Sequence, residues 1–426
     1  MTRMKDSGIE WIGEVPEEWG IKPIKHIFGA IGSGTTPDSS KVEYYDGNIN
    51  WLQSGDLYKK DYVYAVSKTI TDLGYRSSAS LRIYQAPFLA IAMYGASIGN
   101  LAISKIDACV NQAVAVLKGE ENIVRFAKLA LEISKTELIF AAQGGTQPNI
   151  NQVLIKNWVI PFPSEIEIKK IADFLDKKVA QLDKIKSLLE EQIKTLEDYR
   201  KSLIYETVTK GLDKTVPLKD SGVDWIGQIP EGWGVKPIKY CSRFQRGFGF
   251  PVELQGNDDG EIPFYKVSDL RGNSDEISIS KNYVDLQTAK QNAWVIVPSG
   301  AIIAPVIGAA LLNNNRKIST VPFISDNNTL AIIPNNKNKY FYYLFKVIDM
   351  NWFNNSSTIP AVNISKLANQ IVPTPKEEEQ KQIADFLEVQ IIKIDKLIEI
   401  KQKQINNINQ QRQTLIYDVV TGKRRV

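Results

Sequence analysis

The chain contains one long phrase twice. KDSGIEWIGEVPEEWGIKPIKHI at residues 5–27 returns as KDSGVDWIGQIPEGWGVKPIKYC at residues 219–241. A repeat period of roughly 20–50 residues would indicate a solenoid, but this period is about half the chain. The repeat therefore indicates that a whole domain and its connector are duplicated. Two shorter phrases also return: IADFLDKKV (171–179) as IADFLEVQI (383–391), and RKSLIYETVT (200–209) as RQTLIYDVVT (412–421).

Composition sets the broad class. A prior of about one domain per 150 residues gives two to four domains for 426 residues. The net charge of +4 is too small to diagnose nucleic-acid binding by itself. Cys109 and Cys241 have no partner at metal-binding spacing, and two isolated cysteines fit a reducing compartment. No apolar run reaches the roughly 18–20 residues of a membrane span, and residues 1–13 lack an apolar signal region, so we expect a cytoplasmic protein with no membrane partner.

The only histidine, His26, stands opposite Tyr240 in the repeat. The duplicated unit therefore does not need an imidazole at this place, which argues against Ser-His-Asp and His-based zinc chemistry in it. We expect His26 to be a partly buried structural residue.

Two segments of the chain predict sheets. Residues of about 1–160 and 213–372 hold short apolar runs between glycines and turn residues, such as FLAIAM (88–93) and AIIAPVI (301–307). Runs of this length, bounded by turn residues, are typical of buried strands. Each segment is therefore expected to form a strand-rich globule.

The segments that follow predict long helices. After Pro163 neither proline nor glycine occurs until Gly211, and a second such segment follows Pro375. In both, apolar residues recur at heptad spacing, which is typical of a coiled coil. The predicted seam consists of Leu175, Leu182, Ile185, Leu189, Leu196 and Leu203, then Leu387, Ile391, Ile394, Ile398, Ile405, Ile408 and Leu415.

Pairing of the two helices with each other would bury both seams. The alternative is an amphipathic helix lying flat on its own globule, but about 45 residues at about 1.5 Å each give roughly 65 Å, longer than a small domain. An antiparallel pair also relates the two repeats by a two-fold axis. We predict an α+β protein in which two globules and two long antiparallel coiled-coil helices form a circular arrangement with pseudo-two-fold symmetry.

Motifs for catalysis are incomplete. GAIGSG (29–34) is like a phosphate-binding loop, but no Lys-Ser/Thr pair follows it. Asp38 and Glu43 form a weak nuclease-like carboxylate pair, yet Tyr45 stands where such a site needs lysine. An Asn-Pro-Pro-aromatic run, as in amino-methyltransferases, is absent from the sequence. The sequence therefore predicts a recognition protein and not an enzyme.

Polar and aromatic residues of the globules are candidates for contacting DNA. Arginine and glutamine form paired hydrogen bonds with guanine and adenine, and lysine contacts phosphates. The alternative for each one is an ordinary solvated side chain. The candidates are Thr35, Thr36, Lys59, Lys60, Arg76, Arg82, Tyr94, Gln143 and Gln147 in the first globule, and Arg246, Phe248, Lys266, Arg271, Arg316 and Lys317 in the second.

The two copies of the repeat are conserved in some segments and diverged in others. The repeated phrases are nearly the same, whereas residues 51–144 and 264–356 match at few positions. A duplicated frame with two dissimilar globules suits a reader of two dissimilar half-sites.

The order of the motifs resembles a known family. GSGTTP (32–37), INWLQSGDL (49–57), YGASIG (94–99), VNQAVAVL (110–117) and GTQPNIN (145–151), set in the duplicated frame, are similar to the specificity (S) subunit of type I restriction-modification enzymes. The resemblance covers essentially the whole chain. The second copy departs from it at RGFGFP (246–251), and VTKG (208–211) departs from VTGK (420–423).

The resemblance implies an organisation and a set of partners. Residues 1–163 would form a first target-recognition domain, 164–212 a first helix, 213–375 a second target-recognition domain and 376–426 a second helix. Each domain would read one half-site of a bipartite asymmetric site in double-stranded DNA, with the helices as spacer. Two methyltransferase (M) subunits would dock on the helices, joined by restriction (R) subunits. S-adenosylmethionine and ATP would belong to those partner subunits, with no cofactor in this chain.

Two rival classes remain open: a stand-alone DNA-modifying enzyme, and a coiled-coil scaffold with no role on DNA. Neither explains why the frames match while the globules diverge.

Overall fold

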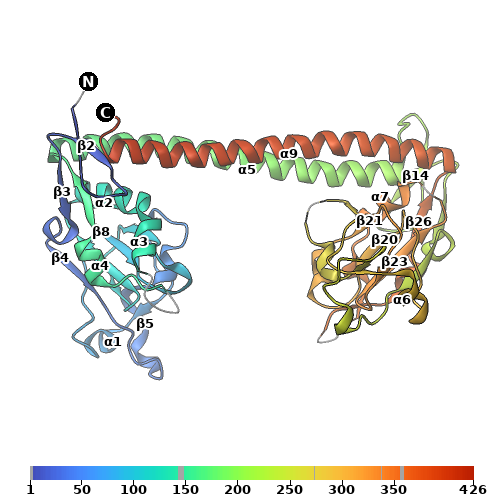
Figure 1. Ribbon diagram of the computed structural model, residues 1–426, viewed down its shortest axis with the longest axis horizontal. Helices are drawn as coiled ribbons and strands as arrows, with labels where there is room; N and C mark the ends of the chain where they lie inside the picture. Colours follow the sequence, from blue (N-terminus) through green and yellow to red (C-terminus); the bar gives the residue numbers. More distant parts are fainter. Residues whose placement is uncertain (1–2, 143–147, 273, 337, 356–358) are drawn as a thin grey trace. The chain divides into compact units, whose positions relative to one another are not determined.

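A computed structural model describes residues 3–142, 148–272, 274–336, 338–355 and 359–426 (Figure 1). The chain divides into two compact units. Unit 1 comprises Met1–Glu190 and Gln402–Val426, and unit 2 comprises Glu191–Lys401. Each unit therefore holds one globule together with part of each long helix. The predicted division into four segments stays a prediction about independently folding domains.

The long helices begin and end where the sequence provides signals. Helix α5 (Glu165–Lys210) follows Pro163, and helix α9 (Glu377–Val420) follows Pro375. The glycines that follow them, Gly211 and Gly422, have φ angles of 70° and 76°. Glycine adopts this left-handed conformation without strain, so it commonly ends a helix. The order Lys-Gly in one copy and Gly-Lys in the other therefore shifts the helix end along the repeat.

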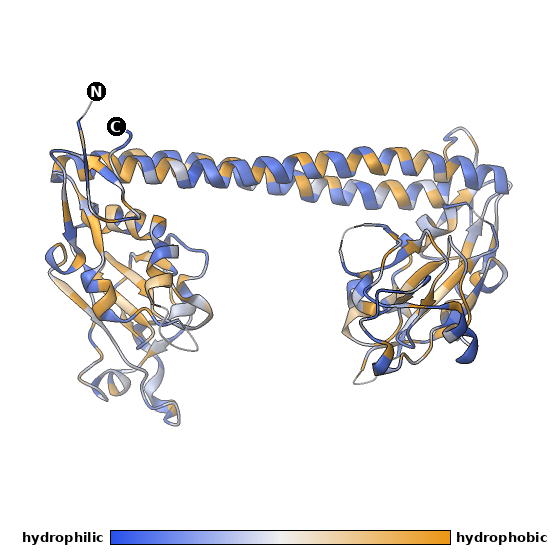
Figure 2. Ribbon diagram, viewed as in Figure 1, coloured by the Kyte–Doolittle hydropathy of each residue, from blue (hydrophilic) through white to orange (hydrophobic). Residues whose placement is uncertain are grey.

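The helices pair in an antiparallel manner within each unit. In unit 1 the start of α5 shares a buried cluster with the end of α9, where Ile171 and Leu175 lie with Ile416 and Val419. Both helices carry apolar residues among polar ones along their length (Figure 2). In unit 2 the end of α5 (Ile204, Val208) shares a cluster with the start of α9 (Ile383, Leu387). The two clusters confirm the predicted antiparallel pairing of the helices.

Burial of the predicted seam is uneven. Ile185 is 45% exposed and Leu188, three residues later, is 48% exposed. The prediction that Ile185 lies in the buried seam is therefore wrong. A straight helix drifts by about 20° per heptad from a strict seven-residue repeat, which turns residues at the margin of the stripe toward solvent. Leu175, Leu387, Ile391, Ile394 and Ile405 are buried, and Leu182, Leu189, Leu196, Leu203, Ile398, Ile408 and Leu415 are half-buried.

The two globules have the same sheet topology. Each has a five-stranded sheet with a parallel outer pair and a three-stranded sheet that joins a parallel and an antiparallel pair. In unit 1 the five-stranded order is β4 (Ala30–Ser33), β11 (Val114–Lys118), β8 (Phe88–Ala92), β9 (Leu101–Ser104) and β6 (Tyr62–Val63); in unit 2 it is β16 (Ser242–Arg246), β23 (Thr329–Pro334), β20 (Ile302–Pro305), β21 (Lys317–Ser319) and β18 (Glu276–Ile277).

The three-stranded sheets also correspond. Their orders are β10 (Cys109–Val110), β5 (Tyr45–Leu52) and β7 (Thr69–Ile70) in unit 1, and β22 (Ile324–Ser325), β17 (Ile262–Tyr265) and β19 (Tyr283–Val284) in unit 2. The sequences diverge, but the central strands β8 and β20 are buried along their whole lengths. Apolar strand cores therefore preserve the topology while the residues around them change.

A helix follows the strand β11 or β23 in each globule. Helix α2 (Glu121–Ile133) packs on β8 and β9, and α7 (Tyr340–Val347) lies in the same core as Ile302 and Leu330 of its sheet. The remaining elements are α1 (Asp72–Arg76), α3 (Lys135–Ala141) and α4 (Gln152–Asn157) in unit 1, and α6 (Leu286–Gln291), α8 (Ile364–Asn369), β24 (Asn354–Asn355) and β25 (Ala361–Val362) in unit 2.

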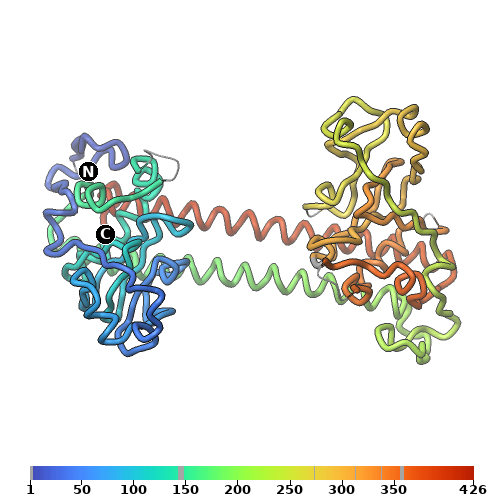
Figure 3. The backbone as a smooth tube through the Cα atoms, turned by 90° about the horizontal axis from the view of Figure 1, so that it is seen from below, coloured from blue at the N-terminus to red at the C-terminus, as the bar shows by residue number. Residues whose placement is uncertain are grey.

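The repeated phrase forms two short pairings in each unit. It contributes hairpins β1 (Met4–Asp6) with β2 (Glu14–Pro16) and β13 (Leu218–Asp220) with β14 (Gln228–Pro230), and pairs β3 (Gly20–Pro23) with β12 (Val159–Phe162) and β15 (Gly234–Pro237) with β26 (Ile371–Thr374). Hairpin β1–β2 and the C-terminal end of α9 both belong to unit 1 (Figure 3). His26, expected to be partly buried, is exposed on the short helix that follows β3.

Candidate nucleic-acid interface

The repeated phrase is the joint between each globule and the helix ends. In unit 1 the Tyr417 hydroxyl of α9 donates to the carbonyl of Ile12 at 3.2 Å. The Trp19 indole donates to Glu167 of α5 at 3.3 Å. One phrase thus contacts the end of one helix and the start of the other. The counterparts in unit 2 are Tyr205 to Ile226 at 3.2 Å and Trp233 to Glu379 at 2.9 Å.

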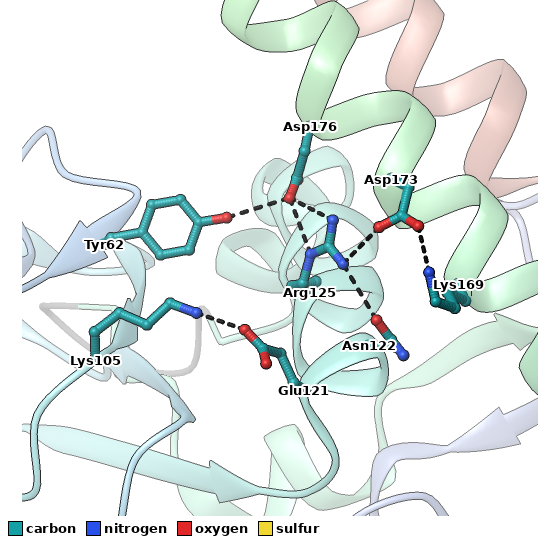
Figure 4. A network of polar contacts seen from close by, with 8 residues as sticks. All are labelled: Tyr62, Lys105, Glu121, Asn122, Arg125, Lys169, Asp173 and Asp176. Atoms are coloured by element: carbon teal, nitrogen blue, oxygen red, sulfur yellow. Dashed lines mark hydrogen bonds and ion pairs between the residues drawn. The ribbon is translucent and has the colours of Figure 1, made fainter.

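A second set of contacts joins the first globule to α5. Arg125 of α2 forms ion pairs with Asp173 at 2.9 Å and with Asp176 at 2.6 Å, and the Tyr62 hydroxyl donates to Asp176 (Figure 4). Burial would lower the pKa of Arg125, but the carboxylates of Asp176 and Asp173 outweigh burial and raise it. The guanidinium therefore stays charged and binds the helix in two directions.

Unit 2 makes this contact with different residues. Lys339, at the start of α7, forms ion pairs with Glu388 of α9 at 2.6 Å and with Glu276 at 2.8 Å. Glu388 stands at the place of Asp176 in the repeat. Glu276 is the first residue of β18, as Tyr62 is the first residue of β6, and an aspartate precedes each of them. The joint is kept while its chemistry differs, which matches the divergence of the globules.

A loop after the first strand of each five-stranded sheet lies tightly against a neighbouring loop. A Cβ added to Gly34 would lie 1.8 Å from the Val110 carbonyl oxygen, and one added to Gly247 would lie 1.9 Å from the Asp326 carbonyl oxygen. Only glycine allows so close an approach. The Thr-Thr-Pro loop and the loop Phe248–Pro251 therefore occupy the same place, although their sequences differ.

In unit 1 this loop is fixed by hydrogen bonds. The Trp51 indole donates to the Thr35 carbonyl at 3.3 Å, and the Thr36 hydroxyl bonds the side chain of Gln112 at 2.6 Å. Thr35 is half-buried, whereas Thr36 is exposed. The pair Thr36–Gln112 presents hydroxyl and amide groups that are able to hydrogen-bond a base edge.

In unit 2 the same place is apolar and acidic. Phe248 donates its backbone N–H to the Ser325 carbonyl at 2.8 Å and is half-buried. Phe250 stacks on Phe264 with ring centroids 3.9 Å apart. Burial raises the pKa of the Asp326 carboxyl, which accepts from the backbone N–H of Asn328 at 3.1 Å. The two globules therefore present different chemistry on the same framework.

Most of the predicted basic residues are on the surface. Arg76 ends α1, which lies at the end of unit 1 away from α5 and α9 (Figure 1), and Lys59 lies over the Tyr58 ring at 5.1 Å. Lys266 is half-buried and bonds Gln255 at 2.9 Å, and Tyr94 is half-buried as well. The exposed basic residues of the predicted set are Lys59, Lys60, Arg76, Arg82, Arg246 and Arg271.

Two predicted DNA contacts are wrong. Arg316 is 3% exposed, and Lys317 is 6% exposed. The Arg316 guanidinium donates to the carbonyls of Phe345 and Ile348, the latter at 2.8 Å, and burial lowers its pKa to about 10. Lys317 donates to the Arg271 carbonyl at 3.0 Å. Arg316 directly precedes strand β21 and Lys317 begins it, and Ile318 of this strand shares a buried cluster with the aromatic residues of α7.

Gln143 and Gln147 lie outside the described residues. The sequence interpretation missed Gln112 and Asp326, which lie opposite the glycine loops. Each belongs to a pair of polar residues that directly follows a short buried strand, β10 or β22. Such a pair after a buried strand is the sequence signal that could have identified both residues as candidates.

Two further observations concern the described residues alone. Among them, no group of three or more His, Cys, Asp or Glu side chains is arranged to hold a metal ion. Likewise, none of the helices in the described ranges is both long and apolar enough to cross a membrane.

Two globules of one topology, each joined to the same helix pair and each presenting its own surface, define a duplicated recognition protein. A family model for the type I restriction modification DNA specificity domain matches residues 16–196 and again 230–410. The chain belongs to this DNA-binding family, and the two matches correspond to two target-recognition domains.

Individual relatives agree with this assignment. The chain is 26% identical over 440 residues to the type I restriction enzyme MjaIX specificity subunit of Methanocaldococcus jannaschii, covering 97% of this chain and 95% of the relative. It is 26% identical over 340 residues to the EcoBI specificity subunit of Escherichia coli, covering 74% and 69%.

Solved structures share the fold. A chain from work on the complex assembly and conformational transition of the type I R-M system matches with a TM-score of 0.73 and 14% identity, covering 95% of this chain and 98% of that one. The HsdS subunit from Thermoanaerobacter tengcongensis matches with a TM-score of 0.53 and 14% identity, covering 96% and 98%. The predicted α+β fold with two globules is confirmed.

Proposed function

We propose that this chain recognises a bipartite, asymmetric DNA site, with one half-site read by each globule. The observation that carries this proposal is the contrast at the glycine loops. The framework around Gly34 and Gly247 is the same, but Thr35 and Asn111 stand in one globule where Phe248 and Asp326 stand in the other. Two globules with the same fold but different surface side chains are suited to two different DNA half-sites.

The exposed side chains supply two kinds of contact. Arg76 and Arg82 in the first globule, and Arg246 and Arg271 in the second, are free on the surface side to form the paired hydrogen bonds that distinguish guanine. Lys59 and Lys60 are exposed and suited to phosphates, which position a protein without reading sequence. Thr36 and Gln112 add neutral groups for other base edges.

The reaction itself belongs to partner chains in this proposal. Two methyltransferase subunits dock on the helix surfaces, bring S-adenosylmethionine and modify the bound site. Restriction subunits join them and use ATP. This chain contributes the sequence specificity, has no cofactor of its own and is not an enzyme. We place it in the cytoplasm, where the genome of a prokaryotic cell lies.

Mapping methylated bases in the genome of a cell with and without this gene tests the proposal. We expect methylation that depends on the chain within a motif of two unlike blocks separated by a constant gap. A contiguous motif, a palindromic one, or an unchanged methylation pattern would contradict it.

The purified chain separates the two rival classes. Methyl transfer or cleavage by the chain without partners would identify a stand-alone enzyme. Absence of any shift of duplex DNA when methyltransferase subunits are present would favour a scaffold with no role on DNA.

A further inference from the structure

We propose that Arg200 and Arg412 are positioning residues that lock the helix pairing and the seat of each globule, and thereby set the gap between half-sites. The two arginines occupy the same place in the repeated phrases RKSLIYETVT and RQTLIYDVVT. Each one contacts both the opposite helix and the neighbouring globule within its own unit. We call each set of contacts an arginine clamp.

The first limb of each clamp joins the two helices. Arg412 of α9 lies 3.4 Å from Asp183 of α5, and Arg200 of α5 lies 3.4 Å from Asp395 of α9. Asp183 and Asp395 also correspond in the repeat, because each lies twelve residues after the isoleucine of IADFL. The same residue pair therefore bridges the helices once in each unit, with the roles of α5 and α9 exchanged.

The second limb reaches the globule. Arg200 pairs with Asp275 at 3.0 Å, and Asp275 pairs with Lys346 of α7 at 2.5 Å. In unit 1 Arg412 pairs with Glu132 of α2 at 2.5 Å, and Glu132 pairs with Lys128 at 3.0 Å.

The globule residues correspond as well. Lys128 of α2 pairs with Asp61, as Lys346 of α7 pairs with Asp275. Asp61 comes directly before β6 and Asp275 directly before β18, and their carbonyls accept equivalent backbone bonds at 2.9 Å from Ile103 and Ile318. The clamp in unit 1 differs mainly by one added carboxylate, Glu132.

The clamps keep their residue types where the surroundings have changed. The neighbouring contact uses Arg125 with Asp176 in unit 1 but Lys339 with Glu388 in unit 2. In contrast, arginine, aspartate and lysine recur in both clamps. Partly buried ionic networks have few arrangements that satisfy every charge, so they are suited to specifying one register.

Each clamp lies at the border of an open pocket between the helices and the globule of its unit. A solvent-open pocket of about 330 Å³ lies beside the clamp of unit 1, lined by Asp61, Lys128 and Arg412. One of about 780 Å³ lies beside the clamp of unit 2, lined by Arg200 and Lys346. The Arg412 and Arg200 side chains are 17% and 24% exposed. The clamps therefore add directional ionic contacts beside the apolar clusters that pack each globule on its helices.

The test compares Arg200→Gln and Arg412→Gln with Lys201→Gln in the full chain. Lys201 is the matched control because it is adjacent to Arg200, is 79% exposed and pairs with Asp198 of the same helix at 3.7 Å. The first readout is hydrogen exchange of α5 and α9, which needs no DNA. We expect about tenfold faster exchange beside the altered clamp and no change in the control.

The second readout rests on the proposed function. Duplexes carry the two half-sites at the natural gap or at gaps one base pair longer or shorter. We expect the preference of the wild-type chain for the natural gap to fall by about tenfold in both arginine variants, because the globules are no longer held in one register. A merely structural role would weaken binding at all gaps alike.

The outcomes are distinct. Folded arginine variants that exchange like the control, or that exchange faster but keep the full gap preference, would overturn the positioning role. If the arginine variants fail to fold, the same readouts on Asp395→Asn decide, because that side chain is 49% exposed and its loss removes only the limb between the helices. If the wild-type chain shows no gap preference, the proposed function is contradicted. Hydrogen exchange would still test whether the arginines hold the helices, because that readout needs no DNA.

Discussion

At the scale of single residues, chemistry follows from surroundings that the sequence does not display. Arg316 and Arg271 are both arginines in polar stretches of the second globule, yet Arg316 is 3% exposed and Arg271 is exposed. The first is held by backbone carbonyls, and the second is available to a ligand. The periodicity of NNNRKIST was too weak to reveal strand β21, so both appeared equivalent as DNA contacts.

Arg316→Ala should destabilise the second unit. It removes the donors that satisfy the carbonyls of Phe345 and Ile348, and a buried polar group left without a partner costs about 1–3 kcal/mol. We expect the free energy of unfolding to fall by about 3 kcal/mol in total, measured by denaturant titration. Arg271→Ala is the control, and an equal loss in both would refute the structural role of Arg316.

Cys109 should make stability depend on pH in the alkaline range. Burial raises the pKa of its thiol to about 11, whereas an unfolded thiol ionises near about 8.5. The unfolded state therefore loses its proton first, and stability should fall as pH rises from about 8.5 to about 11. The difference between the unfolding free energies of the wild-type chain and Cys109→Ala isolates this contribution, and a pH-independent difference would contradict it.

At the scale of elements, the long helices were the most predictable part of the chain. The stretches without proline or glycine and the heptad spacing predict both helices and their pairing, and the structure has α5 at Glu165–Lys210 and α9 at Glu377–Val420. The margin of the seam was less predictable, because burial of Ile185 depends on the local twist of the pair. Strands of two residues, such as β6 and β18, carry too little pattern to be predicted at all.

Two substitutions on the helices should differ sharply. Leu387→Ala empties a fully buried site and should cost about 2–5 kcal/mol of unfolding free energy, as large-to-small core changes do. Ile185→Ala alters a side chain that is 45% exposed and should cost less than about 1 kcal/mol. Thermal and denaturant unfolding of both variants measure this, and equal costs would mean that the seam is as uniform as the heptad spacing predicts.

At the scale of the whole molecule, duplication is the organising fact. The main joints of unit 1 have counterparts in unit 2, from Trp19–Glu167 and Trp233–Glu379 to the two arginine clamps. The sequence predicts these frames because their phrases repeat. It does not predict which globule residues face DNA, since that depends on loops such as those at Gly34 and Gly247 whose neighbours are distant in sequence.

The first half of the chain should therefore pair with itself. Residues 1–212 contain one globule, one long helix and both partners of a joint, because Trp11 and Ile12 correspond to Trp225 and Ile226, which meet the end of α5. We expect a dimer in analytical ultracentrifugation that binds a symmetric site. A monomer that still binds one half-site tightly would contradict the circular arrangement.

Selection of bound duplexes from a randomised pool tests the central claim most directly. The full chain, assembled with methyltransferase subunits, should select two unlike blocks separated by a constant gap. Arg76→Ala should relax one position in one block, and Arg271→Ala one position in the other, each by about 1–3 kcal/mol of discrimination. A single contiguous block, or a variant that alters both blocks alike, would contradict the account that each globule reads its own half-site.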